Sequence, residues 1–272
     1  MDGPEAAAED RPPDFVEALA KGLSILECFD AAHGEMTLSE IARRVGLTPA
    51  AARRSLITLM ALGYAGQANK RFFLRPKVLG LGSAFYFSAR IGELLQPELV
   101  RLVEQFGDAS SIATLDRADV IYVAHYSVQR ARRATAVVGA RYPAHATSLG
   151  RVLLAGLGDA ELDACLDAAR LVPLTSKTLT DKAALRREIA AVRERNFSTT
   201  VDQLDYGITA LAVPIRGPNG TTAAALNSSG YSGMVTTDQL VEERLTELQA
   251  AAARIAQTIA RYPILGSIIA SV

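Results

Sequence analysis

Two adjacent arginines on a short predicted helix are the residues whose type and spacing most suggest a chemical role. Arg53 and Arg54 follow Ala50 and Ala51 in the second of two capped helices within residues 37–63. Small side chains let a helix approach a DNA major groove closely, and guanidinium groups reach guanine edges or phosphates. An ordinary helical hairpin with a solvated basic face has the same pattern, so this stretch alone leaves both interpretations open.

The distribution of charge favours DNA binding. Residues 41–92 contain nine Lys or Arg residues and no Asp or Glu, whereas residues 1–40 contain ten acidic and two basic residues. The net charge of zero for the whole chain therefore conceals a basic segment over the two helices. Neutralising phosphates requires such a local field, whatever the global balance. The predicted DNA contacts are Thr37, Ser39, Thr48, Pro49, Ala50, Ala51, Arg53, Arg54, Asn69, Lys70 and Arg71.

A second group of residues could bind a small acid. Ser148 and Leu149 open a predicted helix, and the free N–H groups and dipole of a helix start favour a carboxylate. Asn227 and Ser229 alternate along a predicted strand, so they share one face and can serve as polar anchors in an apolar cavity. These residues predict a binding site for an organic acid.

Three further side chains could supply positive charge to that acid. They are Arg133, Arg141 and His145. Arginines outside a core are more often solvated surface cations, and a single histidine is more often a structural residue. Both interpretations remain open for each of the three.

Local signals position the two basic helices. Thr37 and Glu40 form a capping box at the start of the first helix, and Gly46 supplies the left-handed residue that ends it. Thr48 caps the second helix, with Pro49 at its first position. The pattern predicts a tight turn between two short helices.

Neighbouring segments extend this motif. An amphipathic helix is predicted over residues 14–31, and a hairpin that turns near Asn69-Lys70 forms a wing. Residues 77–89 are apolar nearly all round, so this helix must be buried, and we favour burial against a second copy of the chain. Residues 1–12 are expected to be a disordered tail.

The remainder of the chain predicts an α+β domain, with helices on a mostly antiparallel sheet. The predicted helices cover 98–106, a segment starting near Thr147-Ser148, 159–168, 181–195 and 238–261. The predicted strands lie within 110–126, which turns at Asp116–Asp119, and at 133–139, 208–215 and 222–229.

Several classes of protein are disfavoured. No run of 18 apolar residues exists and the amino terminus is acidic, so we expect no membrane span and no signal peptide. Cys28 and Cys165 lie in separate helical patterns, which suits a reducing cytoplasm. His33, His125 and His145 lack metal-binding or catalytic spacing, so no metal, cofactor or catalytic residue is predicted. An enzyme, or a sensory module that binds RNA instead of DNA, remains as an alternative.

These motifs resemble the IclR-type bacterial transcription regulators over the stretch from Phe15 to Tyr262. The resemblance is most specific in LSEIARRVGLTPAAARRSLITLMALGY, GARYPAHATSLGRVLLA, YGITALAVPI and ALNSSG. The segments ARRSLITLMALGY and FFLRPKVLGLG are similar to the branch that controls protocatechuate and 4-hydroxybenzoate catabolism. The resemblance implies a winged helix-turn-helix over residues 13–76, a dimerising linker helix over 77–92 and a GAF-like effector domain over 93–272.

The resemblance also implies partners and contacts. Such regulators act as dimers or tetramers, bind an operator in double-stranded DNA and respond to small aromatic or dicarboxylic acids. Gln203 stands where a glutamate is common in the family, which leaves Thr200–Asp205 doubtful as effector contacts. Effector binding is expected to change the spacing of the two recognition helices. The effector contacts that the resemblance carries over are Tyr142, Ser148, Leu149, Ala210, Asn227 and Ser229.

Overall fold

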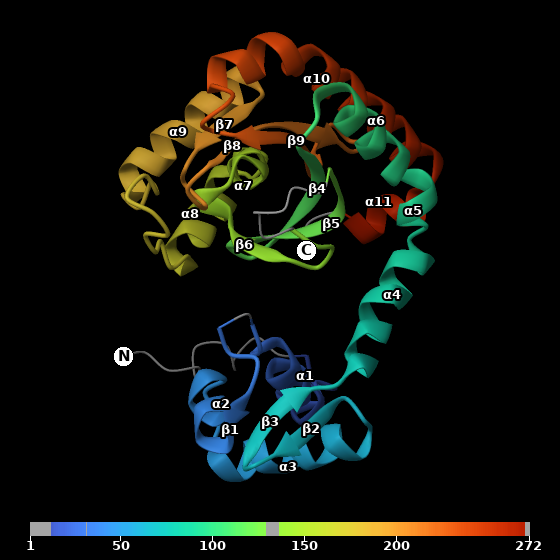
Figure 1. Cartoon of the computed structure of the whole chain (residues 1–272), viewed down its shortest axis with the longest axis vertical. Coiled ribbons are helices and arrows are strands. Elements are labelled where there is room, and N and C mark those ends of the chain that lie inside the picture. Colours follow the sequence, from blue (N-terminus) through green and yellow to red (C-terminus); the bar gives the residue numbers. More distant parts are fainter. Residues whose placement is uncertain (1–11, 31, 129–135, 270–272) are drawn as a thin grey trace. The chain divides into compact units, whose positions relative to one another are not determined.

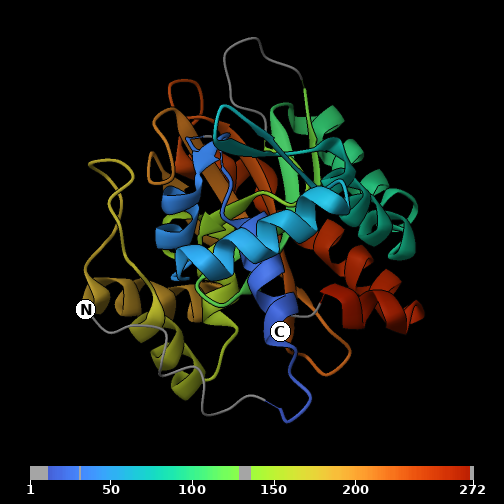
Figure 2. The same cartoon turned by 90° about the horizontal axis from the view of Figure 1, so that it is seen from below.

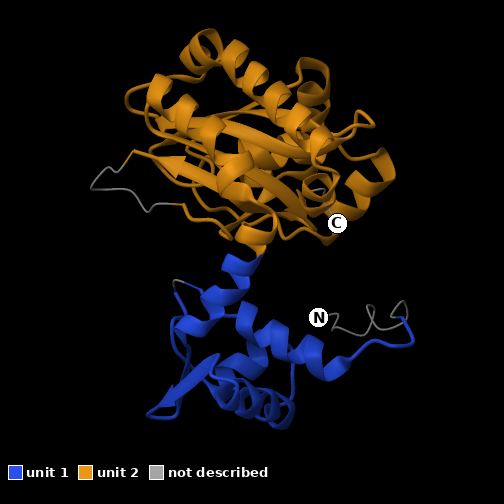
Figure 3. Ribbon diagram, turned by 90° about the vertical axis from the view of Figure 1, so that its right-hand side faces the viewer, with its two compact units in different colours: residues 1–84 blue, residues 85–272 orange. Residues whose placement is uncertain are grey.

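The computed structural model describes residues 12–30, 32–128 and 136–269 (Figure 1). The chain divides into two compact units, residues 1–84 and 85–272 (Figure 3). None of the helices in the described ranges combines the length and the apolar character that crossing a membrane requires.

The first unit is a winged helix-turn-helix, as predicted. Helices α1 and α3 pack together (Figure 2), and α2 packs on α3. Its core contains Ile25, Ile41, Leu56 and Phe72. The elements are α1 (Glu17–Glu27), β1 (Met36–Thr37), α2 (Leu38–Arg44), α3 (Pro49–Ala61), β2 (Ala65–Ala68) and β3 (Arg71–Leu74), with the antiparallel strand order β1-β3-β2.

The predicted caps and turns are present. The Thr37 N–H donates to Glu40 Oε2 at 2.7 Å, and the Glu40 N–H donates to Thr37 Oγ1. The Ala51 N–H donates to Thr48 Oγ1 at 3.2 Å, at the start of α3. Asn69 and Lys70 have φ of 48° and 64°, which fits the two-residue turn of a β-hairpin.

The apolar helix predicted over residues 77–89 is α4 (Leu79–Ser88), preceded by a 3₁₀ turn over Pro76–Val78. Phe85 and Tyr86 pack against the core of the second unit. Leu79 and Phe87, however, are 75 % and 74 % exposed. A single copy of the chain therefore buries only part of this helix.

The second unit is built on a six-stranded antiparallel sheet with the order β6-β5-β4-β9-β8-β7. Alternate residues of each strand face two helical layers, because the side-chain period of a strand is two. The strands are β4 (Ala109–Asp116), β5 (Asp119–Ser127), β6 (Arg141–Pro143), β7 (Ser198–Val201), β8 (Ile208–Arg216) and β9 (Thr222–Tyr231). The helices are α5 (Ile91–Leu94), α6 (Gln96–Phe106), α7 (Ser148–Ala155), α8 (Asp159–Ala168), α9 (Lys182–Arg195), α10 (Thr237–Arg261) and α11 (Pro263–Ile269).

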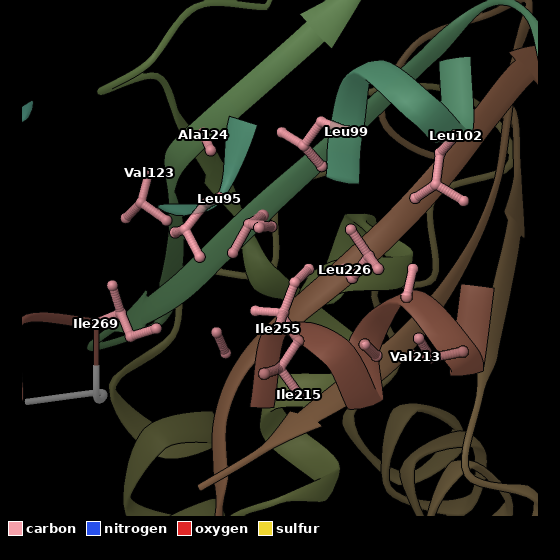
Figure 4. Packing of buried hydrophobic residues seen from close by; sticks show 14 of the residues in the cluster. Leu95, Leu99, Leu102, Val123, Ala124, Val213, Ile215, Leu226, Ile255 and Ile269 are labelled. Carbon is pink, nitrogen blue, oxygen red and sulfur yellow. The ribbon is translucent and has the colours of Figure 1, made fainter. Parts of the chain in front are cut away.

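The two helical layers have separate cores. Helices α6, α10 and α11 cover one face, where Leu99, Leu226 and Ile255 lie in a common cluster (Figure 4). Helices α7, α8 and α9 cover the other face, where Leu149 and Ala225 belong to a second cluster. The sheet thus separates α7 from the layer formed by α6, α10 and α11.

One predicted strand is wrong. Of residues 133–139, the described part, 136–139, is a turn in which Gly139 has φ of 86°, and the next strand is β6. The Gly139 N–H donates to Tyr122 O at 2.7 Å, which returns the chain to the edge of β5. The short strands β1 and β7 and the helices α5 and α11 were not predicted.

Candidate functional site

The outer face of α3 carries the predicted basic residues. Ala52, Leu56 and Leu59 are buried against the rest of the unit, and this fixes the rotation of the helix. Arg53 and Arg54 are consequently exposed. Among the ion pairs of the described residues neither arginine has a partner, so both guanidinium groups are available to a polyanion.

Some of the other basic residues are neutralised within the unit. Arg44 pairs with Asp30, and Arg71 lies 3.6 Å from a Glu35 carboxylate oxygen and 3.9 Å from one of Glu40. The cause is the pairing of β1 with β3, which places Thr37 opposite Arg71. Residues 41–92 contain no acidic residue, but the fold places acidic side chains from the preceding segment beside some of their basic residues. The available cations of this segment include Arg53 and Arg54, while Arg71 is committed to acidic neighbours.

The remaining predicted DNA contacts lie at the starts of α2 and α3 and in the wing. Thr48, Pro49 and Ala50 are exposed, as are Asn69 and Lys70 at the tip of the hairpin. Ser39 is exposed as well, whereas Thr37 and Ala51 are half-buried by their roles at the helix starts. The structure thus places the predicted residues on a helix start, a helix face and a hairpin tip.

An apolar groove runs beside α3 in the same unit. It encloses about 690 Å³ and is lined by α1, α3 and the start of α4, including Leu19, Leu23, Leu62 and Leu81. Arg54 borders this groove. The recognition helix is therefore flanked by an uncovered apolar surface.

The second candidate site is a cavity in the second unit, between the start of α7 and the sheet. It encloses about 130 Å³. The sheet forms one side of the cavity, which we call its floor. The strand register places the floor residues next to one another, because Ser111 lies opposite both His125 and Asn227, and Ser229 lies opposite Ala210. These side chains come from two hairpins, β4-β5 and β8-β9, which are distant in sequence and are joined in the sheet by the pairing of β4 with β9.

Hydrogen bonds fix the polar floor of the cavity. The Ser111 N–H donates to Asn227 Oδ1 at 2.8 Å, and Ser111 Oγ lies 2.9 Å from His125 Nδ1. The Gln96 side chain donates to His125 O at 3.1 Å. The Asn227 oxygen is thus engaged within the protein, which leaves the two N–H donors of its amide for a ligand.

Two buried polar atoms of the cavity lack a hydrogen-bond partner among the described residues. They are Ser148 Oγ and His125 Nε2. Leaving such an atom unsatisfied costs roughly 1–3 kcal/mol, so each calls for an explanation. Both atoms are buried, so a bound molecule would reach them only if neighbouring side chains moved.

The start of α7, beside Ser148, has the free backbone amides that an anion could accept hydrogen bonds from. Thr147 Oγ1 accepts the Gly150 N–H at 2.9 Å, and the first helical amides, of Ser148 and Leu149, have no acceptor within the helix. Gly150 lies against the preceding turn, where a Cβ atom would be 2.2 Å from the Ala144 carbonyl oxygen. The free amides and the helix dipole together favour a carboxylate at this end of the cavity.

The aromatic wall of the cavity is electrically neutral. Burial raises the pKa of Tyr122 and of Tyr142, and it lowers the pKa of His125. The rings of Tyr122 and Tyr142 meet edge to face with centroids 5.1 Å apart. Asp108 is the one acidic side chain, and there is no Lys or Arg, among the described residues that line the cavity.

The strand β9 is also held from the opposite helical layer. Arg244 of α10 donates from Nη1 to Ser228 Oγ at 3.0 Å and to Ser229 O at 3.3 Å. Its guanidinium carbon lies 5.5 Å from the centre of the Phe106 ring of α6. Burial lowers the pKa of Arg244, and Asp108 partly counters that effect.

The structure separates the predicted effector contacts into two groups. Those that line the cavity are Tyr142, Ser148, Leu149, Ala210, Asn227 and Ser229, and Thr200 lines it as well. Arg141 and His145 do not line it, and Arg133 lies outside the described residues.

Strand alternation and packing explain the two described exceptions. Tyr142 points to the cavity, so its neighbour Arg141 points outward and lies 2.6 Å from Asp116 and 3.4 Å from Asp119. His145 is buried under the start of α7, with Nε2 3.1 Å from Val172 O. Of the two described candidates, neither therefore supplies positive charge to the cavity lining.

Among the lining residues that sequence reasoning missed are Ser111, Tyr122 and His125. Tyr122 and His125 are three residues apart in β5 and break strand alternation, because Val123 has no partner between the pairs Ile112–Ala124 and Ala113–Tyr122. The irregularity between Ile112 and Ala113 shifts the register of β4 against β5. Pattern alone could not show that His125 faces Ser111.

Comparison with known proteins identifies both units. The family model described as the IclR helix-turn-helix domain matches residues 18–68, and the one described as the bacterial transcriptional regulator IclR C-terminal matches residues 85–257. The chain is 38 % identical over 243 residues to the Pca regulon regulatory protein of Pseudomonas putida, which covers 89 % of this chain and 83 % of that protein.

Two solved structures extend the comparison. A transcriptional regulator from Rhodococcus sp. RHA1 is 40 % identical, with a TM-score of 0.74, and the match covers 91 % of this chain and 99 % of that one. A double mutant of the inducer-binding domain of PobR from Acinetobacter, in complex with 3-hydroxybenzoic acid, is 31 % identical with a TM-score of 0.56. That match covers 59 % of this chain and 94 % of the other.

Proposed function

The chain belongs to the IclR family of bacterial transcriptional regulators, and we propose that it is a regulator of aromatic catabolism whose operator binding is controlled by a small acid. The DNA contacts would come from α3 and the wing, and the acid would bind in the cavity beneath α7. The cavity carries the proposal, because its lining brings the free start of α7 together with the polar residues Ser111 and Asn227 of the sheet.

The relatives support this assignment. The Pseudomonas protein is named for the Pca regulon, and the Acinetobacter domain binds 3-hydroxybenzoic acid. We infer that the effector of the present chain is likewise a small aromatic or dicarboxylic acid. Since its relatives are named as regulators, we assign no catalytic role to the chain.

We further propose that the chain works as a dimer or a dimer of dimers. The match to the helix-turn-helix domain ends at residue 68, and the match to the C-terminal domain begins at residue 85. This gap supports a DNA-binding domain over 13–76, a linker helix over 77–92 and an effector domain over 93–272. The exposed apolar residues of α4 and the groove beside α1 support contact with a second copy. A dimer presents two recognition helices to two half-sites.

Operator binding tests the proposal. Duplexes selected from a random pool by the purified protein would be titrated at several salt concentrations. Arg53→Ala and Arg54→Ala should each weaken binding, and loss of a phosphate contact should reduce the salt slope by about one. Addition of a hydroxybenzoate should change the affinity of the wild-type protein for the selected duplex.

The matched control is Arg187→Ala, which removes an exposed arginine from α9 of the second unit. It should leave operator affinity unchanged. Equal affinity of all three variants would remove α3 from the DNA interface. Tighter binding of RNA than of any duplex would favour the alternative of a sensory module with another partner.

A further inference from the structure

The exposed surface of α3 has two sides with different surroundings. Ser55 and Thr58 line the apolar groove that α3 shares with α1. Ala50, Arg53 and Ile57 are exposed and are not among the described residues that line this groove. Because these three residues are spaced by three and four positions, they form one continuous stripe along the helix, which we call the outer stripe.

The outer stripe combines an apolar side chain with a cation. Ile57 is 45 % exposed, because the core contacts of α3 are made by Ala52, Leu56 and Leu59. It follows Arg53 by four residues, so the two side chains are neighbours on the helix surface. Arg53 has no acidic partner among the ion pairs of the described residues. An apolar side chain therefore lies beside a cation that is available to a polyanion.

The chemistry of isoleucine limits what Ile57 can recognise on DNA. Its side chain has no hydrogen-bonding atom, so it gains nothing from a phosphate group or from the polar edge of a base. The apolar group that the major groove presents is the C5-methyl group of thymine. A β-branched side chain in a helix is largely confined to one rotamer, so little conformational freedom is lost when the methyl groups of Ile57 meet it.

The spacing of the outer stripe fits this contact. Ala50, two helical turns before Ile57, has a small side chain that allows the helix to approach the bases. Arg53 and Ile57 are about 6 Å apart along the helix axis, at about 1.5 Å per residue. In a helix that lies along the groove, this separation corresponds to about two base pairs, at about 3.4 Å for each base pair.

We propose that Ile57 recognises the C5-methyl group of a thymine in each operator half-site, within about two base pairs of the contact that Arg53 makes. Ile57 is then a specificity-determining residue, whereas a contact from Arg53 to a phosphate group would carry no sequence information. The inference rests on the proposed function, because it assigns a base to a helix that the proposed function places against DNA. Reasoning from charge alone does not select Ile57.

Replacement of thymine by deoxyuridine tests the inference, because it removes only the C5-methyl group. Each thymine of a duplex selected by the full-length protein would be replaced in turn, and binding would be measured by fluorescence anisotropy. At one thymine of a half-site, the replacement should weaken wild-type binding about fourfold, the usual effect of exposing one buried methyl group. Ile57→Ala should weaken binding to the thymine duplex at least as much and should make binding insensitive to the replacement at that position.

Two further variants serve as controls. Ile57→Val keeps two methyl groups on Cβ and should keep the sensitivity to deoxyuridine. Ile264→Ala is the matched control, because Ile264 is an exposed isoleucine of α11 in the second unit, and it should leave binding to both duplexes unchanged. Alanine is favourable at an exposed helix position, so Ile57→Ala should fold, and melting curves would verify this.

The outcomes separate the inference from the proposed function. Equal sensitivity to deoxyuridine in the wild type and in Ile57→Ala would show that the methyl group acts through the shape of the duplex, and it would overturn the inference alone. A wild-type protein that tolerates every replacement would also overturn it. In both cases, weaker binding by Arg53→Ala and Arg54→Ala would still support the proposed function. If the protein selects no duplex, the inference and the proposed function fail together.

Discussion

At the scale of single residues, Arg151 is a buried cation with no ion-pair partner among the described residues, although the charge of Glu188 acts on it. Its Nε donates to His145 O at 3.1 Å and its Nη2 to Gln203 Oε1, and burial lowers its pKa to about 10. Gln203→Glu keeps the shape and places a negative charge on the buried guanidinium. We expect the melting temperature to rise by a few degrees, since an ionised acceptor in place of the neutral amide should strengthen the bond to the guanidinium by about 1 kcal/mol.

Thermal melts at pH 7.5 would measure this effect. Gln67→Glu makes the same change at an exposed position of β2 and should leave the melting temperature almost unaltered. A lower melting temperature for Gln203→Glu than for the wild type would show that desolvating the new carboxylate outweighs its attraction to Arg151.

Histidine burial gives a second prediction at this scale. Burial lowers the pKa of His125 and of His145, so below about pH 6.5 the unfolded chain binds more protons than the folded one. Stability should therefore be full above that pH and fall as the pH decreases toward 5. Carboxylates such as Asp159, whose pKa is lowered by Arg193, lose their contribution only at lower pH, near 4 and below.

Melting curves from pH 8 to pH 5 would show the decline, and His125→Gln should make it shallower because one of the two proton-linked groups is gone. A melting temperature that is constant over this range would contradict the assignment of both histidines as neutral buried groups.

At the scale of elements, α7 depends on Gly150. An alanine there would place Cβ 2.2 Å from Ala144 O and 2.3 Å from Ala144 Cα, both backbone atoms that cannot yield cheaply. Gly150→Ala should destabilise the unit by about 1–3 kcal/mol and abolish acid binding by displacing the helix start. Gly80→Ala, in α4, meets no atom within 4 Å and should be tolerated. Unchanged melting and binding in Gly150→Ala would exclude α7 as the anion site.

The elements also show how far the sequence could predict this fold. Caps and helical periodicity are local signals. Thr37 and Thr48 were therefore enough to place the starts of α2 and α3, and the helical spacing of apolar residues was enough to place α8 and α9. The contacts between helices were not predictable, and Arg193 of α9 reaches Asp159 of α8 across a separation of 34 residues. Strand β1 forms because Met36 and Thr37 pair with Phe72 and Arg71 of β3. No local sequence pattern predicts such a two-residue strand.

The residues of the cavity also fall into those that could be predicted from local sequence and those that could not. Ser148, Asn227 and Ser229 could be predicted because a helix start and a strand face can be recognised from neighbouring residues. The pairing of Ser111 with His125 could not, since it depends on register past an irregularity in β4. Arg141 was a reasonable candidate by charge, but its position one residue before Tyr142 directs it away from the cavity, toward Asp116.

At the scale of the whole molecule, the uncovered apolar residues of the linker predict self-association. Phe87→Glu should shift the protein toward the monomer in light scattering, because Phe87 is 74 % exposed in a single chain. Operator affinity should fall with it, whereas hydroxybenzoate binding to the second unit should persist. Ile264→Glu, at an equally exposed position of α11, is the control and should leave the oligomeric state unchanged. An unaltered mass for Phe87→Glu would remove α4 from the dimer contact.

The position of Arg244 has a consequence for signalling. Ser229 lines the cavity, while its carbonyl oxygen accepts a hydrogen bond from Arg244 of α10 on the opposite face of the sheet. A molecule that displaced this end of β9 would have to strain or break the hydrogen bonds from Arg244, and Arg244 also lies against the Phe106 ring of α6. In the chain, only the short helix α5 (Ile91–Leu94) separates α6 from α4, so the contact connects the cavity strand to the helix for which we expect self-association.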